Sequence, residues 1–162
     1  MPITLARVDD RVIHGQIITR WSKARTCNGI LVVNDGIAKD AFRSKVLKAA
    51  APEGVKVGIY TLQEGAERVA KAKLAKNGYF VISNSPMDFQ KLLEIGVDWG
   101  NELIVGPMSA KPDAVTIGKN VSVTEQEKEA FDFIQSKNVN IIFQLTPDET
   151  PVKWEKIRLK YS

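Results

Sequence analysis

The sequence is poor in the residues that form disulfides and metal sites. Its 162 residues include one cysteine, Cys27, and one histidine, His14. A single cysteine excludes an internal disulfide, and the usual metal-binding clusters need several cysteines or histidines. We therefore expect no metal site.

Long apolar runs and a secretory signal are also missing. The longest apolar runs, such as 29–33 and 141–143, fall far short of the roughly 20 residues that cross a bilayer. The first residues lack a basic stretch followed by an apolar segment, which is the pattern of a signal peptide. We therefore expect a cytoplasmic protein.

Common sequence signatures of nucleotide and ester chemistry are absent as well. The glycines form neither G-x-G-x-x-G nor G-x-x-x-x-G-K-[ST], so dinucleotide and P-loop triphosphate binding lack their usual signals. No G-x-S-x-G elbow is present, which argues against a serine hydrolase.

The charge is mildly basic, with a formal net charge of +4 from 23 Lys and Arg against 19 Asp and Glu. A basic protein attracts anions, and a nucleic-acid-binding protein is one function that this charge allows. However, the lysines are spread through predicted helices and form no dense run. We interpret them as a solvated surface and expect no nucleic-acid partner.

The composition is that of one folded domain spanning residues 1–162, with 44% apolar and 26% charged residues. Short apolar or β-branched runs alternate with longer amphipathic stretches, which is typical of strands separated by helices. The predicted strands are Ile3 to Val8, Gly29 to Asn34, Val55 to Tyr60, Tyr79 to Ser83, Glu102 to Val105, Val121 to Val123 and Asn140 to Gln144.

Helix start signals lie between these strands. Two segments have the spacing of a capping box, and a third has proline at the first helical position. They are Thr61 with Glu64, Thr124 with Glu127, and Ser85 with Pro86. We predict an α/β fold: an open, mostly parallel sheet of about seven strands with helices on both faces. Met108 to Gly118 is predicted as a loop and Val152 to Leu159 as a closing helix.

Ligands of such sheets bind beyond the carboxyl ends of the strands. The loop from Asp9 to Gly15, after the first predicted strand, is the richest in chemistry there, because it holds two carboxylates, an arginine and the only histidine. A neutral imidazole is nucleophilic near pH 7 and can carry a phosphoryl group that it later passes on. We predict that His14 and Arg11 are catalytic, with Arg11 stabilising phosphoryl charge.

Four neighbours of this pair are predicted to support the anion or its ligands: Asp9, Asp10, Gly15 and Gln16. The helix that starts after Gly15 offers free backbone amides, and glycine permits close backbone approach. Either aspartate could hold the guanidinium or accept a ring N–H, and an ion pair that only fixes the loop is the alternative for Arg11 and both aspartates.

Other polar residues near strand ends have two interpretations. Asn34 and Asp35 either line the same crevice as His14 or only shape a turn with Gly36, and Ser85 is a further crevice candidate. Cys27 lies before its strand, on the side away from these loops, so we interpret it as a structural thiol. Trp21, Trp99 and Trp154 lie in apolar patterns and are interpreted as packing residues.

The run 7–16, R-V-D-D-R-V-I-H-G-Q, resembles the opening signature R-[IV]-D-D-R-[LVI]-I-H-G-Q of one protein family. This is the IIB component of the mannose family (mannose, fructose, sorbose) of the bacterial sugar phosphotransferase system, or PTS. The resemblance extends along the whole chain. Further matches are Val33-Asn34-Asp35, Ala49-Ala50-Ala51-Pro52 with Gly54-Val55, Ser85-Pro86, Val105-Gly106 with Met108, and Lys119-Asn120-Val121-Ser122-Val123-Thr124.

The resemblance implies that His14 is phosphorylated through Nδ1 and that Arg11 helps to hold the phosphoryl group. It implies a phosphohistidine donor on a IIA domain, a sugar acceptor presented by membrane IIC and IID subunits, and no cofactor. Because the chain begins almost at the signature, we expect any IIA domain to be a separate polypeptide. Asn84 and Pro107 depart from the family pattern, where a basic residue and a second glycine are expected.

Some questions stay open at this point. A non-catalytic module that binds phosphosugars or other anions in the same crevice is the alternative to a phosphocarrier. The sequence does not reveal which sugar is transported or whether the chain forms a homo-oligomer.

Overall fold

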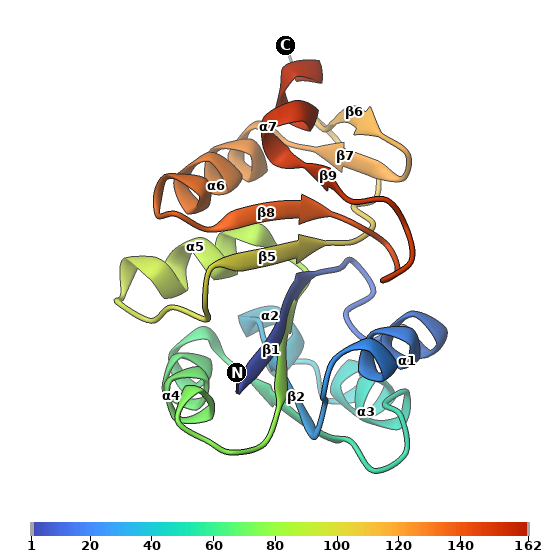
Figure 1. The fold of residues 1–162 in the computed structure, drawn as a ribbon, viewed down its shortest axis with the longest axis vertical. Coiled ribbons are helices and arrows are strands. Elements are labelled where there is room, and N and C mark those ends of the chain that lie inside the picture. The colour runs from blue at the N-terminus through green and yellow to red at the C-terminus, as the bar shows by residue number, and fades with distance from the viewer. Residues whose placement is uncertain (1, 162) are drawn as a thin grey trace.

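The computed structural model describes residues 2–161 as strands alternating with helices (Figure 1). The strands are β1 (Ile3–Val8), β2 (Gly29–Val33), β3 (Lys56–Tyr60), β4 (Tyr79–Ser83), β5 (Glu102–Val105), β6 (Val115–Gly118), β7 (Val121–Val123), β8 (Asn140–Phe143) and β9 (Val152–Lys153). The helices are α1 (Gly15–Ala24), α2 (Asp35–Ala38), α3 (Ala41–Ala49), α4 (Leu62–Lys73), α5 (Pro86–Glu94), α6 (Glu125–Ser136), α7 (Trp154–Ile157) and the 3-10 turn η1 (Arg158–Lys160).

Seven strands form one open sheet in the order β3-β2-β4-β1-β5-β8-β9. Neighbouring strands are parallel except for β9, which is antiparallel to β8 at the edge. All five residues of β2 are buried, as a parallel strand covered on both faces requires. The predicted α/β class and mostly parallel sheet are confirmed.

Helices cover both faces of the sheet, and the order of the strands explains which face each one takes. From β1 to β2 and β3 the chain moves toward one edge, and from β3 to β4, β5 and β8 it moves toward the other. Since crossovers are right-handed, these two directions place helices on opposite faces. Ile18 of α1 and Leu47 of α3 accordingly lie in one apolar cluster, while Val69 of α4, Phe89 of α5 and Phe131 of α6 lie in the other.

Two sequence-based expectations were wrong in part. Residues 121–123 do not join the main sheet; they form β7, which pairs antiparallel with β6 in a separate two-stranded ribbon. The predicted loop from Met108 to Gly118 therefore contains a strand. The ribbon turns at Lys119 and Asn120, where Asn120 has φ 59°, a left-handed conformation that asparagine tolerates better than most residues.

The C-terminal segment also differs from the prediction. Instead of one helix from Val152 to Leu159, the chain forms edge strand β9, then α7 and η1. β9 supplies the seventh strand of the sheet in place of residues 121–123. Trp154 at the start of α7 is fully buried against Phe131 and Phe143, and this packing anchors the segment.

The strand order predicts a ligand-binding crevice at the carboxyl end of β1. β1 lies between β4 and β5, yet the chain after β1 enters a helix on one face, whereas the helices that follow β4 and β5 lie on the other face. Open α/β sheets bind ligands where neighbouring connections diverge in this way. Among the described residues, none of the helices combines the length and the apolar character needed to span a bilayer.

Candidate functional site

The loop 9–14 connects β1 to α1 and is hydrogen-bonded to both neighbouring segments of the sheet. The amide of Asp9 donates to the carbonyl of Ser83 at 2.9 Å, and the amide of Asp10 donates to that of Pro107 at 3.2 Å. The loop then turns sharply, with the amide of Val12 donating to the carbonyl of Asp9 at 2.9 Å. The loop is therefore fixed to the strands on both sides before it reaches His14.

Val12 has an unusual backbone conformation at this turn. Its φ is 61°, in the left-handed region that β-branched residues rarely adopt. Its side chain is only 1% exposed and packs in the same apolar cluster as Ile13. Burial of these two side chains offsets the backbone strain, and such strain is concentrated at functional sites.

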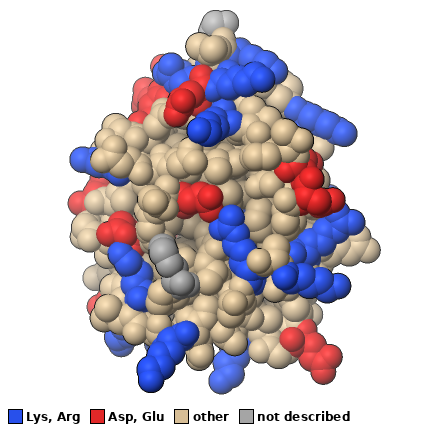
Figure 2. All heavy atoms as spheres, viewed as in Figure 1, with Lys and Arg blue, Asp and Glu red and all other residues tan. Residues whose placement is uncertain are grey.

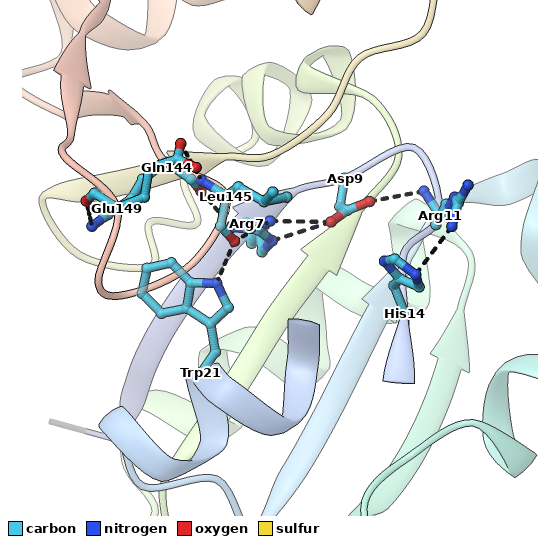
Figure 3. Close-up of polar contacts among 8 residues, drawn as sticks. All are labelled: Arg7, Asp9, Arg11, His14, Trp21, Gln144, Leu145 and Glu149. Carbon is cyan, nitrogen blue, oxygen red and sulfur yellow. Dashed lines mark hydrogen bonds and ion pairs between the residues drawn. The ribbon is translucent and has the colours of Figure 1, made fainter. Parts of the chain in front are cut away.

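His14 is the residue immediately before α1 and is half-buried. Its Nε2 lies 3.0 Å from Nη1 of the exposed Arg11 (Figure 3). A guanidinium only donates hydrogen bonds, so Nε2 accepts this one and the ring proton is on Nδ1. The structure thus brings together the two residues predicted to be catalytic.

The N-terminus of α1 lies beside His14, and its first backbone amides have no hydrogen-bond partner among the described residues. The first intrahelical bond runs from the amide of Ile18 to the carbonyl of His14, so the amides of Gly15, Gln16 and Ile17 precede it. Within residues 2–161, His14 makes no side-chain capping bond, and the first turn of α1 has no acidic residue. A Cβ added to Gly15 would meet nothing within 4 Å. These amides and the helix dipole suit an anion beside His14.

Asp9 positions the loop through its backbone. The carboxylate is buried, and its Oδ1 accepts a hydrogen bond from the amide of Arg11 at 2.9 Å. Its Oδ2 accepts from Arg7, at 3.2 Å from Nη2 and 3.3 Å from Nε. Among the described residues, Asp9 makes no hydrogen bond to the guanidinium of Arg11 or to the His14 ring, the two roles that the sequence suggested.

Asp10 connects the loop to the segment after β5. Its Oδ2 accepts the backbone amide of Ser109, while its own amide donates to Pro107. The segment that carries Pro107 therefore contributes a backbone carbonyl and a backbone amide, and a carbonyl oxygen is available from proline as it is from glycine. Among the described residues, Asp10, like Asp9, makes no hydrogen bond to the guanidinium of Arg11 or to the His14 ring.

Arg7 is a feature that the sequence did not single out. Its side chain is fully buried at the end of β1, and Figure 3 shows it between Asp9 and the carbonyls of Gln144 and Leu145. Burial lowers the pKa of the guanidinium, and the carboxylate of Asp9 counteracts this effect. The only sequence signal was the presence of Arg7 in the 7–16 run, since backbone carbonyls have no signature.

The three crevice candidates have structural hydrogen bonds instead. Oδ1 of Asn34 caps α2 by accepting the amide of Ile37 at 3.0 Å, and Oγ of Ser85 caps α5. Oδ1 of Asp35 accepts the amide of Leu62 at 2.8 Å. Within the described residues, none of the three is hydrogen-bonded to Arg11 or His14. Asn34 thus caps the turn that starts α2, whereas Asp35 binds the start of α4, and a role for either in the crevice stays a prediction.

A buried carboxylate, Asp88, lies beneath these loops and was missed from the sequence. It accepts hydrogen bonds from Oγ of Ser83 and, at 2.8 Å, from Nδ2 of Asn34. Burial raises the pKa of Asp88, although the two hydrogen bonds oppose the shift. Asp88 thus joins the ends of β2 and β4.

Cys27 is partly buried at the other end of β2. Its Sγ donates to the carbonyl of Gly29 at 3.6 Å, and burial raises the pKa of the thiol to about 11. A cysteine that accepts a phosphoryl group, like any nucleophilic cysteine, reacts as the thiolate, and a pKa this high keeps the thiol protonated at neutral pH.

On the face seen in Figure 2, Lys and Arg side chains are spread widely, with Asp and Glu among them. A nucleic-acid interface would instead concentrate basic side chains in one stripe or patch.

Comparison with known proteins identifies close relatives of this chain. A family model described as "PTS system sorbose subfamily IIB component" matches residues 3–162. The fructose-specific EIIB component of Bacillus subtilis (strain 168) is 35% identical over 149 residues, covering 92% of this chain and 91% of that protein. The mannose-specific EIIAB component of Escherichia coli (strain K12) is 33% identical over 141 residues, covering 87% of this chain and 43% of that protein.

A solved structure supports the same relationship. The IIBSor domain of the sorbose permease from Klebsiella pneumoniae superimposes with a TM-score of 0.92 at 29% identity, covering 100% of this chain and 99% of that one.

Proposed function

The chain belongs to the sorbose subfamily of PTS IIB components, and from this membership we propose that it carries a phosphoryl group on His14. The donor is the phosphohistidine of a IIA domain, and the acceptor is a sugar held by membrane IIC and IID subunits. The whole chain acts as one cytoplasmic domain that reaches the inner face of the membrane through these subunits. The name of the E. coli relative, an EIIAB component, supports a IIA partner.

The observation that carries the proposal is the Arg11–His14 pair at the free N-terminus of α1. The pair lies after β1, where neighbouring connections diverge. A nucleophile, a planar cation and unpaired amides thus converge on one small region. This combination fits a group that is both transferred and negatively charged.

In the first step a nitrogen of His14 attacks the phosphorus of the donor phosphohistidine. A new N–P bond forms, the donor N–P bond breaks, and its electron pair returns to the donor ring. Attack through Nδ1, as the family resemblance implies, requires that Nδ1 lose its proton. If Arg11 leaves Nε2 for the phosphoryl oxygens, the ring can hold its proton on Nε2 and present a free Nδ1.

In the second step a sugar hydroxyl attacks the same phosphorus. The N–P bond on His14 breaks and its electron pair returns to the ring, while the hydroxyl proton is taken up by a base or by the ring itself. Arg11 and the amides of Gly15 to Ile17 stabilise the charge on the phosphoryl oxygens in both steps. No metal is needed in this scheme.

The test is to incubate the purified chain with phosphoenolpyruvate and the general and IIA components of its own system. We expect an added phosphoryl mass that is acid-labile and maps to the His14 peptide. His14→Gln should remain unphosphorylated, and Cys27→Ser should be phosphorylated like the wild type. Phosphate on Cys27 would overturn the site, and no phosphate from an active donor would favour a non-catalytic anion-binding module.

A further inference from the structure

The backbone carbonyl of Leu145 accepts two hydrogen bonds that come from opposite ends of the His14 segment. Nη2 of Arg7, on β1, lies 3.1 Å from this oxygen, and Nε1 of Trp21, on α1, lies 3.0 Å from it. The segment that carries His14 runs between these two residues. The two contacts and the chain between them therefore form a closed ring that includes His14, and Figure 3 shows both side chains directed toward Leu145.

On the strand side, the ring reaches Arg11 in two steps. Arg7 is fully buried and holds Oδ2 of Asp9, and Oδ1 of the same carboxylate accepts the amide of Arg11 at 2.9 Å. The carboxylate of Asp9 thus connects the side chain of Arg7 to the backbone of Arg11, which contacts His14. Multiple charge-assisted hydrogen bonds of this kind fix geometry more firmly than one neutral bond.

On the helix side, the ring holds α1 itself. Trp21 is 1% exposed and lies seven residues after His14, two helical turns along. The guanidinium carbon of Arg7 lies 5.4 Å from the centre of the Trp21 ring, so the two side chains also contact each other directly. This packing sets where the N-terminus of α1 points.

The anchor at residues 144–145 is fixed by its own hydrogen bonds. The amide of Leu145 donates to Oε1 of Glu149 at 3.2 Å, and Nε2 of Gln144 donates to the carbonyl of Glu149 at 2.8 Å. The carbonyl of Gln144 accepts Nη1 of Arg7 at 3.0 Å. The carbonyl groups that accept from Arg7 and Trp21 therefore belong to a hydrogen-bonded turn.

We propose that Arg7 and Trp21 are positioning residues for the phosphoryl transfer, an inference that rests on the proposed function. Arg11, His14 and the free amides of α1 must reach one phosphoryl group together. The ring fixes the backbone of Arg11 and the direction of α1 relative to each other. Misplacement of reacting groups by about 1 Å can cost about 100-fold in rate, so this spacing matters for transfer.

The main test compares Trp21→Phe with Trp99→Phe. Trp99 is a matched control because it is 2% exposed and its Nε1 also donates to one backbone carbonyl, that of Glu102, at 2.8 Å. Both variants lose one buried indole hydrogen bond, so both should melt at a lower temperature. Only Trp21→Phe should slow phosphorylation by the IIA donor, by about 10-fold.

The second readout is the ¹⁵N spectrum of the imidazole, which contains signals from His14 alone because the chain has one histidine. In the unphosphorylated wild type we expect protonation on Nδ1, with Nε2 accepting from Arg11. Trp21→Phe should shift the signals toward a mixture of tautomers, and Trp99→Phe should leave them unchanged. Wild-type rates and spectra in both variants, with equal losses of stability, would refute the positioning role.

Arg7→Lys provides a second variant, since it keeps the charge but loses the planar set of donors. We expect transfer to slow by about 10-fold to 100-fold, with the phosphate still on His14. If this variant fails to fold, the tryptophan pair still decides. The ¹⁵N spectra are recorded on unphosphorylated protein, so they test the positioning role even if His14 is never phosphorylated. Failure of this inference can therefore be told apart from failure of the proposed function.

Discussion

Nη1 of Arg11 lies 3.0 Å from Nε2 of His14, so the arginine occupies the ring nitrogen opposite the one through which the family resemblance implies attack. This contact selects the tautomer of the empty protein. A phosphoryl group on Nδ1 would lie on the other side of the imidazole, so Arg11 would have to leave Nε2 to meet its charge. Arg11 can therefore act in two successive states, first on the imidazole and then on the phosphoryl oxygens.

Substitution of Arg11 should affect transfer more than stability, because its side chain is exposed. We expect Arg11→Gln to slow phosphorylation of His14 by about 100-fold or more, the scale of losing one charge-stabilising donor. Arg11→Lys should fall between this variant and the wild type, since lysine keeps the charge without the planar donors. Rapid-quench measurement of phosphorylated protein tests both. The exposed Arg68 lies on α4, across the sheet from α1, and Arg68→Gln should transfer at the wild-type rate. A similar loss there would contradict the assignment to Arg11.

Gly106 provides room for the buried arginine. A Cβ on Gly106 would lie 2.3 Å from Nη2 of Arg7 and 3.0 Å from Oδ2 of Asp9. Gly106→Ala must therefore displace this ion pair, and we expect a loss of about 1–3 kcal/mol in unfolding free energy together with slower transfer. At Gly118 the nearest atom would be 3.8 Å away, so Gly118→Ala is the control. Urea unfolding of both variants tests the difference, and equal losses would mean that the close approach at Gly106 is unimportant.

Asp88 should make stability depend on pH in the direction opposite to most carboxylates. Its pKa is raised in the folded protein, so the folded state binds the proton more tightly than the unfolded state. The stabilisation is present near and below the ordinary value of 3.8 and is lost as pH rises through the folded pKa. Asp88→Asn stays neutral, so its stability relative to wild type should be most favourable near pH 7 and decline toward acid. Urea midpoints from pH 4 to 7 test this.

The control for Asp88 is removal of the acceptor. Asp88→Ala leaves the hydroxyl of Ser83 and the amide of Asn34 without their partner. We expect it to be about 1–3 kcal/mol less stable than Asp88→Asn at every pH in that range, because neither variant carries the titrating carboxyl. A difference between Asp88→Asn and wild type that did not change with pH would show that the carboxyl does not titrate as inferred.

The thiol of Cys27 should be inert. Its pKa of about 11, against 9.0 for the unperturbed group, leaves about 100-fold less thiolate at pH 8. We expect iodoacetamide to alkylate Cys27 about 100-fold more slowly than a free cysteine in native protein and at an ordinary rate in urea. Rapid alkylation of the native protein would contradict the buried environment.

The sequence predicted the sheet and helices well where local chemistry determines them. Both capping boxes, Thr61 with Glu64 and Thr124 with Glu127, have their reciprocal hydrogen bonds, and Ser85 caps α5. These signals lie within four residues of each other. Strand β2 was predicted because a buried parallel strand is apolar along its whole length.

The sequence failed where distant segments decide the structure. Residues 121–123 have strand character, but a short strand does not reveal its partner; here it pairs with β6 and also bonds to Met108 instead of joining the main sheet. The contact of Arg7 with Leu145 spans 138 positions and uses a backbone carbonyl, which any residue supplies. Likewise, nothing local indicates that Val12 adopts φ 61°, because burial in the assembled core stabilises it.

The uncapped N-terminus of α1 would link the proposed phosphoryl transfer to the stability of the fold. A phosphoryl group that hydrogen-bonds to the amides after His14 would serve as the missing cap, and caps stabilise helices by about 1 kcal/mol. By thermodynamic linkage the phosphorylated protein would then melt at a higher temperature, and the group-transfer potential of the phosphohistidine would fall by the same amount, about fivefold in equilibrium. Each kcal/mol by which these amides stabilise the bound phosphoryl group would therefore lower, by the same amount, the free energy available for its transfer.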